Sequence, residues 1–439
     1  MPVILMDLLY LPAALLYLPV LLYQMLVQKK NRRGWLQRFG RVERRELNRP
    51  CVWIHAVSLG EINAARPFVE QIVRRLPSHD VAISATTDTG YASACRLYPS
   101  ALVFRYPLDF SWVVRRVLRR IRPSAIVLME LEVWPNLITL THRRGIPICI
   151  ANGRVTEHRS MRGFRLPVLR GIARRMFSRI AWIAAQDATY AARFIELGAP
   201  KDRVFVTGST KFDAAAISDR VEGDELVAGE MGIDRKRPLV VAGSTGPGEE
   251  EMLLAAYGAM VKESADLQLA IVPRRPERFE EVARLIESKG YRCRRRSHRD
   301  EGSGQTSGDS HRVVFLGDTM GELRKFYSLA DVVFVGRTLV PLGGSDLMEI
   351  AGLGRPMCHG PYVENFADIA ESLRSANAAV RIDNAAQLSS VLGGLLADPA
   401  AAKAMGLRAQ DVVKRNLGAS GKTVDLLCET LTESSRGAN

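Results

Sequence analysis

The sequence predicts an α/β protein with two doubly wound, parallel-sheet domains that face a cleft, preceded by an apolar helix. Short apolar runs alternate with segments of helical period, which is typical of a parallel sheet with helices on both faces. This series starts again after a polar stretch at residues 218–237. At 439 residues, the chain is also too long for one ordinary hydrophobic core, so two domains are expected.

The chain is expected to divide into four segments. Residues 1–30 form an anchor, 31–217 an N-terminal domain, 218–237 a linker and 238–439 a C-terminal domain. The final helix, near residues 401–431, has no strand after it and could pack back on the N-terminal domain.

The apolar N-terminal segment predicts a membrane anchor. Residues 3–27 are almost wholly apolar and long enough to span a bilayer. Basic residues follow at 29–33, which favours a cytoplasmic location for the rest of the chain. Pro12 and Pro19 would kink a helix, so a helix lying in the membrane interface remains an alternative to a span. Because the apolar run ends before the first expected strand, we expect the body to fold without it.

The composition limits the partners and cofactors. A formal net charge of +14 fits an anionic membrane surface or acidic substrates, whereas dispersed cations without a recognition motif argue against nucleic acid. The six cysteines form no close pair, which predicts neither a zinc ribbon nor a redox pair and favours a reducing compartment. The sequence has no P-loop and no dinucleotide fingerprint. We therefore expect neither a cofactor nor a metal ion.

Glu61 is the first candidate site residue. The apolar run at 52–57 is typical of a buried strand and helical spacing begins at Ile62, so Glu61 lies where a strand ends and a helix begins. Ligands of open α/β sheets bind at the carboxyl ends of strands, and Gly60 would let a ligand approach closely. Glu61 is therefore a candidate catalytic base. The alternative is a first-turn carboxylate that only complements the helix dipole.

The second domain carries features that suit a nucleotide. The pair Gly343-Gly344 precedes a helix, and a glycine turn at a helix N-terminus suits a phosphate. Arg274, at the end of an expected strand, could add charge-assisted hydrogen bonds to that phosphate. Glu349, one turn into the helix, could accept hydrogen bonds from ribose hydroxyls. The alternative for Asp346 and Glu349 is a helix capping box.

Six stretches, taken together, carry a family resemblance. They are WIHAVSLGE, ELEVWPN, GSTGPGEEE, VPRRPERF, LGDTMGEL with the following FYSLADVVFVG, and LVPLGGSDLMEIAGLGRPMCHGPYVENF. In sequence and in order they resemble the bacterial 3-deoxy-D-manno-octulosonic acid (Kdo) transferases of lipopolysaccharide assembly. The resemblance implies a GT-B fold, an anchor in the inner membrane and a catalytic body on its cytoplasmic face. It also implies an inverting transfer of Kdo from CMP-Kdo to a lipid A precursor.

The resemblance implies roles for individual residues. Glu61 matches the general base of the family, while Glu130 and Lys211 match positions kept for the acceptor or donor-sugar region. The other matching positions are donor contacts in the second domain: Ser244, Pro273, Arg274, Met320, Gly321, Glu322, Asp346, Leu347, Met348 and Glu349.

The chain also departs from the family pattern. Ser345-Asp346 replaces the usual His-Asn after the paired glycines, Arg275 replaces a histidine, and residues 130–134 read ELEVW in place of ETELW. An aspartate beside the CMP phosphate adds repulsion unless it caps the helix. Two alternatives therefore stay open. One is a GT-B transferase that uses another activated sugar, and the other is a catalytically inactive, membrane-tethered binding homologue.

Overall fold

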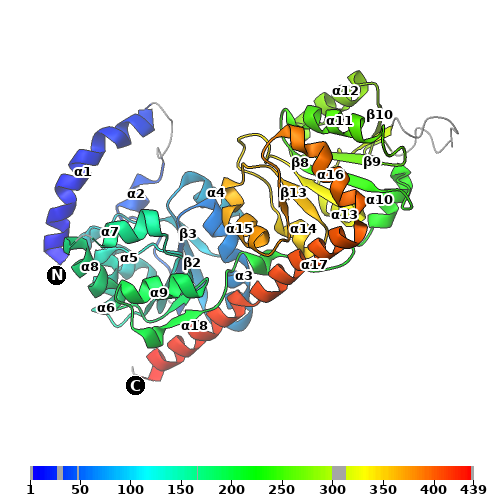
Figure 1. The fold of residues 1–439 in the computed structure, drawn as a ribbon. Coiled ribbons are helices and arrows are strands. Elements are labelled where there is room, and N and C mark those ends of the chain that lie inside the picture. The colour runs from blue at the N-terminus through cyan, green and yellow to red at the C-terminus, as the bar shows by residue number, and fades with distance from the viewer. Residues whose placement is uncertain (1–2, 27–32, 47–48, 166, 299–312, 437–439) are drawn as a thin grey trace. The chain divides into compact units, whose positions relative to one another are not determined.

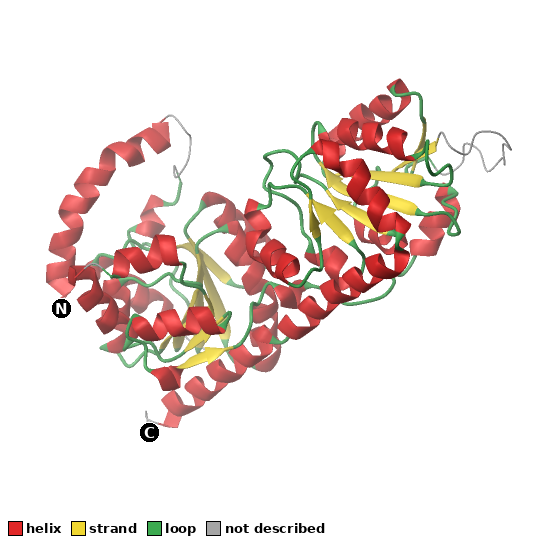
Figure 2. Cartoon of the chain, viewed as in Figure 1, coloured by secondary structure: helices red, strands yellow, loops and turns green. Residues whose placement is uncertain are grey.

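The structure is a computed structural model of the 439-residue chain and describes residues 3–26, 33–46, 49–165, 167–298 and 313–436. The chain divides into two compact units, each with one parallel sheet and flanking helices (Figure 1, Figure 2). Unit 1 comprises Met1–Ala214 and Asn416–Asn439, and unit 2 comprises Ala215–Arg415.

Unit 1 contains a seven-stranded parallel sheet with the spatial order β3-β2-β1-β4-β5-β6-β7. The strands are β1 (Cys51–Ala56), β2 (Asp80–Ala85), β3 (Leu102–Arg105), β4 (Ala125–Met129), β5 (Ile148–Gly153), β6 (Ile183–Ala185) and β7 (Val204–Val206). The strand order reverses between β1 and β4, because β1 pairs with both β2 and β4. The loops that follow β1 and β4 therefore meet at the switch point of the sheet, where ligands of doubly wound sheets bind.

Helices cover both faces of this sheet because alternate strand residues point to opposite sides. On β1, Val52 and Ile54 pack into one core with α3 and α18, whereas Cys51 and Trp53 pack into the other with α5 and α6. The helices of unit 1 are α1 (Val3–Leu26), α2 (Trp35–Arg38), α3 (Leu59–Arg75), α4 (Asp88–Leu97), α5 (Ser111–Ile121), α6 (Pro135–His142), α7 (Arg162–Phe164), α8 (Pro167–Phe177), α9 (Ala188–Glu196) and α18 (Ala419–Arg436).

Unit 2 has a second seven-stranded parallel sheet, in the order β10-β11-β9-β8-β12-β13-β14, with its switch point between β8 and β12. Its strands are β8 (Leu239–Thr245), β9 (Gln268–Pro273), β10 (Arg292–Arg295), β11 (Val313–Leu316), β12 (Val332–Val335), β13 (Met357–His359) and β14 (Val380–Arg381). Its helices are α10 (Asp224–Met231), α11 (Glu249–Met260), α12 (Phe279–Ser288), α13 (Leu323–Leu329), α14 (Met348–Gly352), α15 (Ala367–Ser375), α16 (Leu388–Ala397) and α17 (Pro399–Asn416).

Two segments differ from the sequence expectations. Residues 218–237, expected as a linker, include α10, whose Val227 and Met231 are buried in unit 2. Residues 294–311 are charged and rich in glycine and serine, which predicts a surface loop, but they begin inside β10, which pairs in parallel with β11. Residues 299–312 lie outside the described residues. A short charged strand such as β10 (Arg-Cys-Arg-Arg) has no apolar alternation, so its sequence did not predict a strand.

The two terminal helices both belong to unit 1. Helix α18 packs on α3, and the Arg75 guanidinium forms an ion pair with Asp425 at 2.6 Å. Among the described helices, α1 is the one that length and composition would allow to cross a membrane. Its first residues are not separate from the body, however, since Val3 is buried in a core of unit 1. We therefore revise the expectation that the body folds independently of this segment.

Candidate functional site

The loop after β1 presents Glu61 at the switch point of unit 1. Ser58 caps helix α3 by accepting a hydrogen bond from the Glu61 backbone N–H at 3.4 Å. The Glu61 carboxylate turns back toward the strand, where it accepts hydrogen bonds from the Val57 N–H at 2.8 Å and the Ser58 hydroxyl at 3.2 Å. Glu61 is therefore a first-turn carboxylate, as the alternative interpretation expected, and its side chain also accepts hydrogen bonds at the start of α3. These hydrogen bonds hold the carboxylate in one orientation.

The environment of Glu61 changes its acidity. The pKa of Glu61 is raised to about 7: burial is the largest cause, the like charges of Glu130 and Glu132 act in the same direction, and the hydrogen bonds from Val57 and Ser58 oppose them. A carboxylate with a pKa near neutrality is well matched to general-base catalysis at cellular pH. The capping and catalytic interpretations are therefore compatible in this geometry.

The first turn of α3 leaves space beside Glu61. A Cβ atom placed on Gly60 would have the Ser58 Oγ, at 3.8 Å, as its nearest neighbour among the described residues. The surface over Gly60 is therefore open, as close approach of a ligand requires.

Glu130 lies across the switch point, immediately after β4. Its backbone adopts a left-handed conformation with φ 58°, although it is not a glycine. Its N–H donates to the Ala151 carbonyl, and its carboxylate lies 3.7 Å from the Lys211 Nζ. Asn152, at the end of the neighbouring strand β5, is also left-handed, with φ 54°. Strained backbone of this kind clusters at functional sites, so the ends of β4 and β5 are candidates for substrate contact.

Two further residues of the ELEVWPN stretch, Glu132 and Trp134, join Glu130 at this site. Burial raises the pKa of Glu132, and its carboxylate accepts a hydrogen bond from the Trp134 Nε1 at 3.2 Å. The Trp134 side chain is 38% exposed, with its ring 6.4 Å from that of Tyr106. A half-exposed indole beside carboxylates is suited to packing against a sugar ring. The motif itself was the signal that could have identified both residues.

His55 on β1 does not compete with Glu61 as a base. Its ring is fully buried and stacks on Tyr106 with ring centroids 3.7 Å apart. Burial lowers the pKa of His55 to about 3, so the ring is neutral at physiological pH. We assign it to the core.

In unit 2, the loops after β8 and β12 meet at the switch point. Ser244 forms a bulge where the β8–β9 register shifts, and its φ is 56°. Arg337, after β12, has φ 62°. A Cβ atom placed on Gly336 would lie 2.5 Å from the Ser244 carbonyl oxygen, so only a glycine allows the two loops to approach this closely. Strained backbone thus marks the switch points of both sheets.

Glu249 connects these two loops, a role that local sequence pattern does not predict. Its carboxylate is fully buried and accepts four backbone hydrogen bonds. One comes from Gly246, at 2.9 Å, in the loop after β8. The other three come from the loop after β12, donated by Arg337, Thr338 and Leu339 at 2.5, 2.8 and 2.9 Å. The first glutamate of GSTGPGEEE is therefore a positioning residue that holds both loops.

Pro273 and Arg274 end β9 beside this point. Pro273 is buried, and the Arg274 N–H donates to the Thr245 carbonyl at 3.1 Å. The Arg274 side chain is exposed and makes no hydrogen bond or salt bridge to any other described residue, although its charge acts on the Asp346 and Glu349 carboxylates. A guanidinium without an internal hydrogen bond can bind an anion.

The segment from Asp346 to Glu349 has mixed roles. Asp346 accepts a hydrogen bond from the Met348 N–H at 2.9 Å and so caps the short helix α14. Leu347 and Met348 have buried side chains, so a ligand could meet their backbone but not their side chains. Glu349 is exposed. Gly343 and Gly344, with φ 80° and 83°, form the preceding turn.

The segment from Met320 to Glu322 lies before α13. Met320 is 67% exposed, and a Cβ atom on Gly321 would meet no described atom within 4 Å. Glu322 is internally paired: although burial raises its pKa, hydrogen bonds from Arg296, Thr319 and Lys325 hold the pKa at about 2. Met320 and Gly321 are therefore open to a ligand, whereas the Glu322 carboxylate stabilises the loop.

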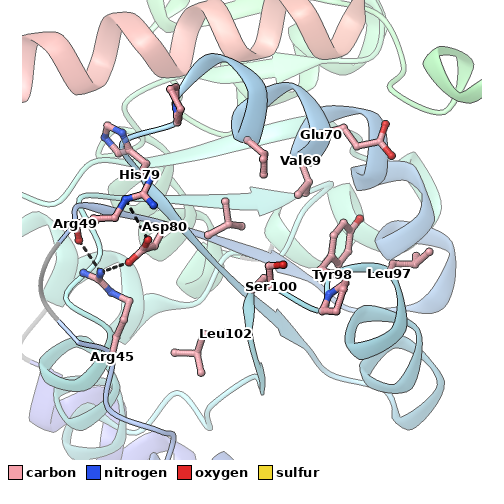
Figure 3. A pocket seen from close by; sticks show the side chains of 15 residues that line it. Arg45, Arg49, Val69, Glu70, His79, Asp80, Leu97, Tyr98, Ser100 and Leu102 are labelled. Atoms are coloured by element: carbon pink, nitrogen blue, oxygen red, sulfur yellow. Dashed lines mark hydrogen bonds and ion pairs between the residues drawn. The ribbon is translucent and has the colours of Figure 1, made fainter.

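A cavity in unit 1 lies away from these strand ends. It has a volume of about 830 Å³ and is lined by residues at the amino ends of β2 and β3 (Figure 3). Its charged groups pair with one another, since the Arg45 guanidinium lies 2.8 Å and that of Arg49 3.6 Å from the Asp80 carboxylate. Among the described residues, no group of three His, Cys, Asp or Glu side chains is arranged to hold a metal ion.

Comparisons with known proteins agree on a family. A protein-family model described as 3-deoxy-D-manno-octulosonic-acid transferase (kdotransferase) matches residues 33–214. The 3-deoxy-D-manno-octulosonic acid transferase of Bordetella pertussis is 36% identical over 386 residues, which cover 86% of each chain. That of Haemophilus influenzae is 31% identical over 382 residues and also covers 86% of each chain.

Solved structures support the fold alone. Acinetobacter baumannii MurG is 14% identical, with a TM-score of 0.54 over 87% of this chain and 99% of its own. The Staphylococcus aureus MnaA–UDP structure has a TM-score of 0.51 at 13% identity, over 87% of this chain and 97% of its own. The two parallel-sheet units thus have the GT-B architecture that the sequence predicted.

Proposed function

The chain belongs to the 3-deoxy-D-manno-octulosonic acid (Kdo) transferase family and is a glycosyltransferase of lipopolysaccharide biosynthesis, and we propose that it moves Kdo from CMP-Kdo to a lipid A precursor such as lipid IVA. In this proposal unit 1 binds the acceptor and unit 2 binds the donor. The enzyme works at the inner membrane, with its catalytic body on the cytoplasmic face.

The observation that supports this proposal most is the state of Glu61. Its carboxylate lies at a sheet switch point, fixed by Val57 and Ser58, with a pKa raised by burial to about 7. In the proposed reaction, the acceptor hydroxyl gives its proton to Glu61 as its oxygen bonds to the anomeric carbon of Kdo. The bond from that carbon to the CMP phosphate oxygen breaks, and CMP leaves as an anion. Attack from the opposite face inverts the anomeric centre.

The remaining roles follow from charge and exposure. The exposed guanidinium of Arg274 is placed to stabilise the departing phosphate. Ser244, Pro273, Met320, Gly321, Asp346, Leu347, Met348 and Glu349 would form the rest of the donor site, with Glu322 ordering its loop. Lys211 and Glu130 form an ion pair near Glu61 and would contact the acceptor or the donor sugar.

The altered Ser345-Asp346 pair does not prevent nucleotide binding in this arrangement. The Asp346 Oδ1 accepts the Met348 N–H, so its charge is directed at a helix end. Burial raises the pKa of Asp346, which further reduces repulsion of a phosphate.

The decisive assay incubates the full chain, in detergent, with CMP-Kdo and lipid IVA, and reads product masses. A mass increase by one or more Kdo units is the expected result. Transfer from another activated sugar with none from CMP-Kdo would favour the alternative transferase. CMP binding without transfer would favour an inactive homologue.

Removing Arg274 should weaken the donor site. We expect Arg274→Ala to lower CMP affinity by about 2 kcal/mol, as loss of a charge-assisted hydrogen bond does. The fold should not change, because the exposed side chain makes no hydrogen bond or salt bridge to another described residue. Isothermal titration calorimetry with CMP measures the effect. Arg284→Ala, which removes another exposed arginine, from α12, is the matched control and should bind CMP as the wild type does. Equal CMP affinity of the two variants would exclude Arg274 from the site.

A further inference from the structure

Helix α1 is joined to unit 1 near its N-terminus. The Asp7 carboxylate accepts hydrogen bonds from the Ser111 N–H at 2.8 Å, the Ser111 hydroxyl at 2.6 Å and the Asn136 Nδ2 at 2.9 Å. Ser111 is the first residue of α5, so Asp7 caps a helix that begins 104 residues later in the chain. A side chain that satisfies helix N-terminal donors contributes to stability.

Tyr10 provides a second attachment one turn further along α1. Its hydroxyl donates to the Asp109 Oδ2 at 2.8 Å, and its ring packs edge-on against Phe110 with centroids 5.8 Å apart. Asp109 also accepts the N–H groups of Asn136 and Leu137, which lie in the first turn of α6. The first third of α1 therefore belongs to the folded body.

The segment that follows α1 is joined to the same unit. The Gln37 Oε1 accepts the Arg105 N–H at 3.0 Å, and the Arg38 guanidinium donates to the Thr86 carbonyl at 2.6 Å. A helix that crosses a bilayer separates its ends by roughly 30 Å along the membrane normal. Here, residues in the first third of α1 and residues that follow α1 both contact unit 1. A crossing would require one of these two attachments to break.

Between its attachments α1 exposes apolar side chains, including Leu15 at 71% and Leu16 at 81%. A second apolar surface, which we call the aromatic patch, consists of Leu36, Phe39 and Trp112. Phe39 and Trp112 stack with centroids 6.2 Å apart, and the Arg116 guanidinium lies 5.4 Å from the Trp112 ring. Exposed tryptophan beside arginine is typical of contact with lipid headgroups. A net charge of +14 suits anionic lipids.

We propose that α1 lies in the plane of the membrane surface instead of crossing it, with Asp7 and Tyr10 fixing it to unit 1 and the aromatic patch resting on the same anionic leaflet. This inference rests on the membrane location given under the proposed function. It also links the membrane to the candidate site, since Asn136 lies two residues after Trp134 in ELEVWPN. The docked helix thereby positions the loop that carries Glu130 and Glu132.

Side-specific labelling tests the topology. An N-terminal extension with one cysteine is added to a Cys95→Ser chain, which removes the exposed native thiol. A membrane-impermeant maleimide should label the extension in inverted inner-membrane vesicles, and not in intact spheroplasts. The Cys95→Ser chain without the extension is the blank. Labelling of Cys95 in the wild-type chain shows on which side of the membrane the body lies. Labelling of the extension in spheroplasts alone would establish a span and overturn the proposal. Loss of the chain from washed membranes would overturn it too. Neither result depends on CMP-Kdo transfer, so the two proposals can fail separately.

Asp7→Leu separates docking from spanning in detergent-solubilised protein. Removing three hydrogen bonds should lower the melting temperature of unit 1 by about 4 °C or more. Leu16→Ala, on the exposed surface of α1, should leave it unchanged. If α1 instead spans the membrane, Asp7→Leu should melt at the wild-type temperature. It should also be harder to extract from membranes than the wild type. Equal melting of Asp7→Leu and Leu16→Ala would contradict the docked arrangement.

A separate variant tests whether the aromatic patch binds the membrane. Trp112→Ala should bind vesicles of phosphatidylglycerol and phosphatidylethanolamine about tenfold more weakly in co-sedimentation, because a large apolar contact is lost. If Trp112→Ala binds vesicles normally but separates a dimer detected by light scattering, the patch is an interface between copies, and its placement on the membrane is wrong.

Discussion

Glu61→Gln should lower the rate of Kdo transfer by roughly a hundredfold or more, in the range that loss of a general base gives. Glutamine keeps the size of glutamate and can still accept the Val57 N–H, so the start of α3 should remain folded. It cannot accept the proton of the acceptor hydroxyl. CMP affinity should hardly change, because the proposed donor contacts lie in unit 2. Steady-state transfer and CMP calorimetry on the same variant measure both effects.

The matched control is Glu70→Gln on the same helix. Glu70 is exposed and pairs with Arg66 four residues earlier, so its substitution should alter neither turnover nor stability appreciably. If Glu61 serves only as a cap, Glu61→Gln would instead show slightly lower stability and normal turnover. Near wild-type turnover of Glu61→Gln would therefore remove the catalytic assignment.

The pH dependence of stability provides a second check on Glu61. Its pKa rises from 4.5 to about 7 in the folded chain. A raised pKa means that the folded state holds the proton more tightly, so the stability from this group is full below its unfolded pKa and is lost as pH rises through about 7. Glu61→Gln does not titrate. Its melting temperature relative to wild type should therefore rise between about pH 5 and about pH 8. Wild-type kcat/KM should increase over the same range, as the base loses its proton.

Glu249→Ala should produce the largest loss of stability. The substitution leaves four backbone N–H groups in the loops after β8 and β12 without their acceptor. Each unsatisfied donor costs about 1–3 kcal/mol, so unit 2 should lose about 4 kcal/mol or more. Glu249→Gln keeps one acceptor oxygen and should be intermediate. CMP binding should weaken with both variants, since Glu249 positions the two loops.

The distribution of tryptophans allows this loss to be assigned to unit 2. All five tryptophans belong to unit 1: Trp35, Trp53, Trp112, Trp134 and Trp182. Tryptophan emission therefore follows unit 1, whereas far-ultraviolet circular dichroism follows both units. In urea, Glu249→Ala should shift the circular dichroism transition to lower concentration and leave the emission transition in place.

Glu251→Ala is the control in the same run of glutamates. Glu251 is exposed and pairs with Lys289 at 2.6 Å, an interaction worth at most about 1 kcal/mol. If Glu249→Ala proves as stable as Glu251→Ala, the four hydrogen bonds do not determine the structure of the loops.

Much of this molecule could be predicted from local sequence pattern. Apolar runs of four to seven residues predicted the central strands of both sheets, such as β1 and β8, because buried parallel strands are apolar on both faces. Alternation of strands and helices then predicted two doubly wound sheets, and the strand ends predicted where Glu61 and Arg274 would lie. Charged or very short strands such as β10 and β14 carry no such pattern and were missed.

Within the candidate site, the sequence by itself determined which residue types stand at the strand ends, since these depend on positions a few residues apart. Only the tertiary structure decided their roles. Glu249 is paired with donors 88 to 90 residues away, and Asp7 caps a helix 104 residues away. Glu322 is internally paired, whereas the Arg274 side chain makes no hydrogen bond or salt bridge among the described residues. The pKa of Glu61 likewise depends on burial and on two glutamates from another strand end. Hydrogen bonding, desolvation and like-charge repulsion all act between neighbours in space, and local sequence pattern does not specify which distant residues become neighbours.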